Sequence, residues 1–330
     1  MEEYLKKLCG YITSGSCPRM DYWQWGQGVC IYALGEAYKK NKDKKCLDYI
    51  FEWLKEHIER KQPGMSVNTT TPLNGVLTLY EITGNDEYMQ LCHEFAEYIV
   101  TACPRCDLGA LEHTCTESSY PNQAWVDTVF MGGIFLARYG SITHKKMYIN
   151  EALRQLVLHY DFLCDEKTGL LHHGYDCNDR TKHGALWGRG NAWFASACPT
   201  VLSYSSDDMP LKKELEKRYL AHLNAIMKYQ RNDGSWGTII NDETSYSETT
   251  GTSGMAYGIA KGISMGYIEK KYCENRDKAY AYLKERIAGD GSMTGGSDGT
   301  CVSDDMNVYK SIKISCSEFS QGLAILAFTI

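Results

Sequence analysis

The sequence has no run of basic residues that could follow a phosphate backbone. Lys and Arg number 35 against 41 Asp and Glu, so the formal net charge is −6, and we expect no nucleic-acid partner. Long apolar runs are also missing: no stretch approaches the roughly 18 residues that cross a bilayer, so we expect no membrane partner. The first residues, MEEYLKKLCGYI, lack the basic and apolar regions of a secretory signal, and we expect a cytoplasmic protein.

The sequence also lacks a disulfide framework. Its 14 cysteines are scattered and several fall within helical patterns, which is typical of reduced thiols in a large intracellular protein. Two cysteines separated by two residues raise zinc as an alternative, in a cluster of Cys103, Cys106, Cys115 and His113. No second pair at a conventional spacing completes the set, so we expect no metal site. Nothing in the sequence implies a cofactor.

The chain does have a repeated pattern of two kinds of helix. At 330 residues and 43% hydrophobic content it can bury a substantial core. One kind is apolar on nearly every side with a glycine near its start: residues 25–38, 71–82, 129–140, 188–202, 251–263 and 318–328. The other is amphipathic and charged: residues 2–12, 46–59, 87–100, 148–163, 211–229 and 275–287. Recurrence every 50 to 65 residues, roughly, indicates stacked helical hairpins.

Six segments of each kind predict a closed ring in which the N-terminal segment joins the C-terminal one. The two kinds differ as an inner, buried set and an outer, half-solvated set should. We therefore predict an all-α chain that forms a single domain over residues 1–330, an (α/α)6 barrel of six inner and six outer helices. An open α-solenoid used as a binding scaffold is the alternative, but both termini lack the polar capping repeats that an open stack needs.

The loops that lead into the inner helices gather at one end of such a barrel, so we expect function there. Unusual residues are concentrated in these loops, which cover residues 21–28, 65–72, 112–127, 170–178, 186–193, 242–254 and 295–309. They contain five of the 7 tryptophans. Aromatic faces beside polar side chains are the usual lining of a sugar site. Packing is the alternative for some of the tryptophans, and we expect Trp53 and Trp125 to fill the core.

Asp127 is the first catalytic candidate, because it lies in the apolar segment AWVDTVFMGGIFLARYG. A role as helix N-cap is the alternative, since aspartate is favoured there. Trp125 and Val126 already belong to the apolar run, so we expect the helix to begin before Asp127 and the carboxyl to be partly buried. Burial raises a carboxyl pKa, while a helix N-terminus and a nearby arginine lower it. A carboxyl group held between these influences can work as a general acid and base.

Arg189 and His173 are the next candidates. Arg189 lies between two glycines in WGRGNAW, and we expect Trp187 and Trp193 to flank its guanidinium. A planar fork held in this way suits a carboxylate ligand, although a structural salt bridge is the alternative. His173, in HHGYD, is expected to be either a neutral donor or a proton carrier, with a purely structural role as the alternative.

Five motifs together resemble glycoside hydrolase family 105, which contains unsaturated rhamnogalacturonyl hydrolases and related unsaturated glucuronyl or galacturonyl hydrolases. In the family's order they are QAWVDTVFMGGIFLARYG, GLLHHGYD, LWGRGNAW, NDGSWG and SYSETTGTSGMAYGIAKGISMGYI. The resemblance implies an (α/α)6 barrel and substrates left by polysaccharide lyases, which end in a sugar acid with a C4–C5 double bond. In such enzymes an aspartate protonates C4, water adds at C5, and the resulting hemiketal falls apart.

Residue by residue, the resemblance makes Asp127 the catalytic aspartate, acting as acid towards C4 and as base towards the water. It implies a set of substrate-binding residues: Trp25, Asn68, His113, His173, Arg189 and Trp193. The expected ligand is an oligosaccharide that contains an unsaturated uronate, with pectin or rhamnogalacturonan as its source.

Asn68 is a departure from the family pattern, because well-studied members carry a second aspartate there. Asparagine cannot titrate, so the resemblance does not carry over a two-carboxylate mechanism or an exact substrate. Asn68 can still orient the sugar or the water through hydrogen bonds.

Two alternatives stay open at the level of sequence. A conventional inverting glycosidase on the same barrel would pair Asp127 with Asp176 or Glu248, at a carboxyl separation of roughly 6.5 to 9.5 Å. A helical-repeat carbohydrate-binding scaffold would have no turnover at all.

Overall fold

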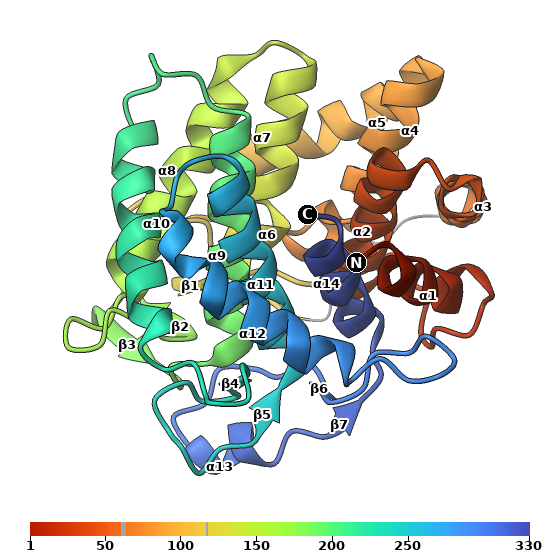
Figure 1. Cartoon of the computed structure of the whole chain (residues 1–330). Coiled ribbons are helices and arrows are strands. Elements are labelled where there is room, and N and C mark those ends of the chain that lie inside the picture. Colours follow the sequence, from red (N-terminus) through yellow and green to blue (C-terminus); the bar gives the residue numbers. More distant parts are fainter. Residues whose placement is uncertain (61–63, 117) are drawn as a thin grey trace.

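Helices predominate in the computed structural model, which describes residues 1–60, 64–116 and 118–330 (Figure 1). One set is buried along nearly its whole length: α2 (Trp25–Asn41), α4 (Leu73–Thr83), α6 (Thr128–Met131), α7 (Gly133–Ile142), α9 (Gly188–Ser203), α11 (Thr249–Ser264) and α14 (Glu318–Phe328). A second set alternates with it and exposes one face: α1 (Glu2–Thr13), α3 (Lys44–Glu59), α5 (Asp86–Glu97), α8 (Lys146–Leu163), α10 (Lys212–Met227) and α12 (Cys273–Lys284). The prediction of a mainly helical chain is confirmed.

The buried helices contact one another in chain order. Helix α2 contacts α4, α4 contacts α7, α7 contacts α9, α9 contacts α11 and α11 contacts α14, which also packs against α2. Helix α1 contacts both α3 and α14, so the two ends of the chain lie side by side (Figure 1).

Short turns join successive helices into antiparallel pairs. Lys42 caps the C-terminus of α2 and Gly84 that of α4, both with the left-handed backbone that stops a helix (φ 57° and 66°). Asp43 and Asn85 follow directly, and each side chain accepts a backbone N–H at 3.0 Å from the next helix. The residue that stops one helix is therefore directly followed by the residue that caps the start of the next, and the second helix folds back on the first.

The third buried segment begins later than the sequence predicted. Trp125 belongs to strand β1 (Gln123–Trp125), and the first helical residue is Thr128. The prediction that the helix includes Trp125 and Val126 was wrong, because their backbone groups bond to another segment: β1 pairs with β2, and the Val126 N–H donates to the His173 carbonyl at 3.0 Å. Gly132 then separates α6 from α7.

Seven short strands lie in the loops, with most of them at the lower end of the view in Figure 1. They are β1, β2 (Gly174–Asp176), β3 (Thr181–His183), β4 (Trp236–Gly237), β5 (Ser247–Glu248), β6 (Gly296–Ser297) and β7 (Ile314–Ser315). The first three form one antiparallel sheet in the order β1-β2-β3, and β4–β5 and β6–β7 form two pairs. Shorter helical turns are η1 (Asn68–Thr70), η2 (Tyr98–Ala102), η3 (Lys270–Tyr272) and α13 (Met306–Lys310). Within the described ranges, no helix combines the length and apolarity needed to cross a bilayer.

Candidate active site

A cavity of about 270 Å³ lies among the loops at the strand-bearing end. Its lining comes from segments far apart in the chain: Trp25, Asn68, His113, Cys115, Tyr120, Trp125, Asp127, Met131, Gly299, Thr300 and Cys301. Four of the predicted site residues are in this lining, namely Trp25, Asn68, His113 and Asp127. Two more, His173 and Trp193, are outside this lining but contact the Asp127 carboxyl group.

Asp127 is at the N-cap position of α6, but its side chain makes no capping hydrogen bond. Its Oδ1 accepts the indole N–H of Trp193 at 3.1 Å. Its Oδ2 lies 3.4 Å from His173 Nε2 and has no hydrogen-bond partner within the described part of the chain. The N-cap alternative therefore does not explain this carboxyl group. Burial by itself would raise the pKa of Asp127, but interactions with His173, and then with His113 and Arg189, outweigh burial and leave the pKa below its ordinary value.

Two histidines flank this carboxyl group. His173 is fully buried, with the Trp187 ring at 4.3 Å and the Trp125 ring at 5.4 Å from its own. The His113 ring stacks on the Trp125 ring, with 4.4 Å between the ring centroids. Burial lowers the pKa of His113 to about 4, so its imidazole is neutral near pH 7 and is a hydrogen-bonding group rather than a charge.

Asn68 lies at the start of η1 and contributes an unused acceptor. Its side chain is only 6% exposed, and its Oδ1 has no hydrogen-bond partner among the described residues. Buried polar atoms are normally satisfied. Asn68 Oδ1 and Asp127 Oδ2 are both unsatisfied and both residues line the same cavity, so a polar ligand would complete them.

Arg189 is held in a different way from the one predicted. Its guanidinium lies 4.4 Å from the Trp187 ring and 4.9 Å from the Phe319 ring, so Phe319 rather than Trp193 is the second flanking aromatic. Nη1 donates to the carbonyl and hydroxyl oxygens of Ser297 at 2.8 and 2.7 Å, and Nη2 donates to the Asp298 carbonyl at 2.7 Å. Arg189 thus fastens the loop after β6 to the start of α9, and its predicted role in gripping a uronate stays a prediction.

The two extra carboxylates of the inverting alternative differ in availability. Glu248 is 1% exposed and caps α11, accepting the N–H groups of Thr250, Gly251 and Ser297 at 2.6 to 3.0 Å. Asp176 lines a neighbouring cavity of about 300 Å³ and not the one that holds Asp127. Asp127 is the one carboxylate among the described residues that line the first cavity.

The structure changes two further expectations. Trp125 does not simply fill the core, because it lines both of these cavities. Tyr309, which the sequence did not single out, is fully buried with its hydroxyl 2.7 Å from His173 Nδ1. It is the last residue of the unusual stretch 295–309, but nothing local to that stretch indicated contact with His173.

Across residues 1–60, 64–116 and 118–330, no three His, Cys, Asp or Glu side chains are placed to hold a metal ion.

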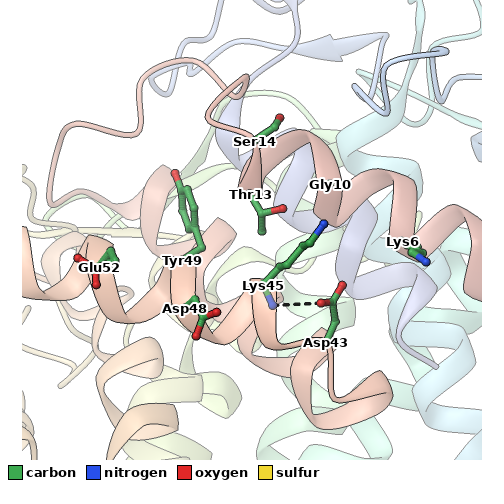
Figure 2. A pocket seen from close by; sticks show the side chains of 9 residues that line it. All are labelled: Lys6, Gly10, Thr13, Ser14, Asp43, Lys45, Asp48, Tyr49 and Glu52. Carbon is green, nitrogen blue, oxygen red and sulfur yellow. Dashed lines mark hydrogen bonds between the residues drawn. The ribbon is translucent and has the colours of Figure 1, made fainter.

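Figure 2 shows another cavity, of about 570 Å³, between α1 and α3. It has a mixed charged lining and contains none of the predicted site residues: Lys6, Gly10, Thr13, Ser14, Asp43, Lys45, Asp48, Tyr49 and Glu52.

An aromatic-walled cavity with one carboxylate at the end of a set of buried helices is consistent with a carbohydrate-active enzyme. The chain belongs to Glycosyl Hydrolase Family 88, whose family model matches residues 4–329. It is therefore a glycoside hydrolase.

Individual relatives agree with this assignment and confirm the resemblance to family 105. The unsaturated rhamnogalacturonyl hydrolase YesR from Bacillus subtilis (strain 168) is 31% identical over 313 residues, which are 93% of this chain and 89% of that protein. A possible member of the GH105 family from Salmonella enterica serovar Paratyphi A superposes with a TM-score of 0.93 at 27% identity, covering 99% of this chain and 92% of the other. Another possible GH105 member, from Klebsiella pneumoniae, gives a TM-score of 0.89 at 29% identity, covering 93% and 81%.

Proposed function

We propose that this enzyme hydrates the C4–C5 double bond of an unsaturated uronic acid at the non-reducing end of lyase-derived oligosaccharides. The preferred substrates are disaccharides from pectin or rhamnogalacturonan, and the products are the ring-opened keto form of the uronate, which no longer has the C4–C5 double bond, and the sugar that leaves. The observation that carries the proposal is the single carboxylate, Asp127, facing a cavity that also holds an unsatisfied amide oxygen and aromatic walls.

Each step of the proposed reaction needs only groups that are present. Protonated Asp127 gives its proton to C4, which leaves positive charge at C5 and the ring oxygen. Ionised Asp127 then takes a proton from the water that adds at C5. The product is a hemiketal at C5, and its collapse breaks the bond between C5 and the ring oxygen. This gives a ketone at C5 and a hemiacetal at C1, and the hemiacetal then becomes an aldehyde as it releases the leaving sugar as an alcohol. One group that both gives and takes a proton is sufficient, so Asn68 in place of a second acid is compatible with turnover.

The remaining predicted residues have supporting roles in this proposal. Trp25 and His113 line the cavity and would contact the uronate ring, while Trp193 and His173 position the Asp127 carboxyl group. The neighbouring cavity shares Tyr120, Trp125 and Cys301 with the first one and would receive the leaving sugar.

The fold proposed for the whole chain is a single-domain (α/α)6 barrel over residues 1–330. The return of contacts from α14 to α2, with the exposed helices alternating outside, supports it. A cytoplasmic location stays a prediction.

The test follows the absorbance of the conjugated enol ether as it disappears. Purified protein is given unsaturated disaccharides from rhamnogalacturonan, from homogalacturonan and from glucuronate-containing polymers. We expect absorbance loss with at least one of them, and Asp127→Asn should reduce kcat by at least about a thousandfold, because the amide cannot donate a proton to C4. Turnover of saturated glycosides without absorbance change would support an inverting glycosidase instead. Binding without turnover would support the scaffold alternative.

A further inference from the structure

Tyr309 and His173 are 136 residues apart in the chain and meet beside the candidate acid. The phenolic oxygen of Tyr309, in α13, lies 2.7 Å from His173 Nδ1, and both side chains are fully buried. Gly184 makes this approach possible. Its φ is +76°, and a Cβ there would lie 2.6 Å from Tyr309 Oη and 3.0 Å from His173 Cβ.

The neighbours of Tyr309 Oη determine which atom is the donor in the hydrogen bond between Tyr309 and His173. The backbone N–H of Ser303 donates to Oη at 3.3 Å. Burial raises the pKa of Tyr309, but backbone hydrogen bonds from Ser303 and from Ala185 act to lower it, as N–H donors do because they stabilise the phenolate. Ala185 is therefore a second N–H donor to Oη. A phenol has one proton to donate and two acceptor sites. Both acceptor sites are occupied, so the phenolic proton is left for His173 Nδ1.

We infer that Tyr309 is a positioning residue that holds His173 as the neutral imidazole with its proton on Nε2, the ring nitrogen nearest to Asp127 Oδ2. Nδ1 accepts from the phenol and cannot take a proton itself without displacing that bond. Nε2 must then carry the hydrogen, and it lies 3.4 Å from Oδ2. The catalytic role of this tautomer rests on the proposed function, whereas the tautomer itself follows from the hydrogen bonds and does not depend on that function.

The consequence concerns the proton that Asp127 must donate. A neutral donor at Nε2 stabilises the ionised carboxylate moderately, whereas an imidazolium would stabilise it strongly and oppose its protonation. The other titratable or charged groups that face this cluster are His113 and Arg189, which act on Asp127, and Asp304, which acts on Tyr309. Tyr309 therefore protects the acid from a full positive charge next to it.

The first experiment needs no substrate. Nitrogen-15 NMR of the histidine side chains distinguishes the two neutral tautomers and the imidazolium, and the His173 signals are assigned by their loss in His173→Gln. In the full-length protein we expect the Nε2–H tautomer for the neutral imidazole. An Nδ1–H tautomer overturns the inference, and this holds even if no variant of Tyr309 folds.

The second experiment uses Tyr309→Phe, which removes the phenolic donor and keeps the ring. We expect the Nε2–H signature of His173 to be lost, because Nδ1 no longer has a donor and is free to take a proton. In the enol-ether assay the alkaline limb of kcat should move to lower pH by about one unit, which is a roughly tenfold loss of kcat on that limb. Tyr219→Phe is the matched control, because that buried hydroxyl donates to the Gly258 carbonyl and does not line the cavity.

The outcomes separate the two claims. If Tyr309→Phe and Tyr219→Phe lower stability alike and neither changes the His173 signals or the pH profile, Tyr309 is only structural. If the wild-type tautomer is as expected but no unsaturated disaccharide is turned over, the proposed function fails while the role of Tyr309 in orienting His173 stands.

Discussion

At the scale of single residues, the candidate site consists of atoms that the protein leaves incomplete. Asp127 Oδ2 and Asn68 Oδ1 lack partners although most buried polar atoms in proteins have one. Carrying unsatisfied atoms costs stability, typically about 1–3 kcal/mol for each. A hydroxyl-rich ligand that binds in the cavity would hydrogen-bond to these atoms and remove this unfavourable contribution to the free energy.

Asn68→Asp tests whether residue 68 shares an electrostatic environment with Asp127. A second carboxylate in the same cavity should raise the pKa of Asp127, since two neighbouring negative charges disfavour each other. The alkaline limb of kcat should then move to higher pH, by up to about one unit. Asn68→Ser is the neutral control and should leave the limb in place. An unchanged profile in Asn68→Asp would mean that the two side chains do not interact.

At the scale of elements, helix starts hold the loops of the site in place. Arg189, in the first turn of α9, binds the carbonyl groups after β6, and Glu248, directly before α11, accepts the Ser297 N–H of the same loop. Gly188 allows α9 to begin so close to β4, because a Cβ there would lie 2.5 Å from the Gly237 carbonyl oxygen. The loop that carries Tyr309 is thus fixed by two neighbouring helices.

Glu248→Gln distinguishes this capping role from catalysis. The amide weakens the bonds to the α11 N–H groups, and we expect the free energy of unfolding to fall by about 1–2 kcal/mol in urea titrations. At a temperature where the variant is folded, kcat should stay within about threefold of wild type, since chemistry runs through Asp127. A kcat loss comparable to that of Asp127→Asn would instead favour the inverting mechanism.

At the scale of the whole molecule, a charged cluster lies away from the candidate site, towards the opposite ends of the buried helices whose starts border that site. Arg138 is fully buried late in α7 and donates to the Asn74 carbonyl at 2.6 Å and to Glu81 at 2.5 Å. Burial alone would raise the pKa values of Glu36 and Glu81, but Arg138 and Lys39 lower both below their ordinary value. A glutamate pKa that is lowered on folding contributes stability above the unfolded pKa and loses it as the pH falls through the folded pKa.

Arg138→Met should therefore destabilise the protein in a pH-dependent way. At pH 7 it removes the buried cation that pairs with Glu81 and that also lowers the pKa of Glu36, and we expect a loss of about 3–5 kcal/mol in the free energy of unfolding. At acid pH, below the lowered folded pKa values, the carboxyl groups are protonated and the difference from wild type should shrink. Arg60→Met is the control, because Arg60 is exposed and its ion-pair partner among the described residues is Glu56, four residues earlier. A loss that is the same at both pH values would contradict this account.

The sequence by itself determined the succession of two helix types, because apolar periodicity and helix stop signals are local properties of the chain. It also indicated Asp127 and the loops around it, since those motifs are contiguous. Tertiary structure alone decided that α6 begins after Asp127, where pairing of β1 with β2 takes the backbone hydrogen bonds that a helix would use. It also decided that Phe319 flanks Arg189, that Glu248 accepts the Ser297 N–H, and that Tyr309 reaches His173. These contacts join segments tens to more than a hundred residues apart, so they depend on how the loops converge once the helices have packed, and no local pattern encodes that convergence.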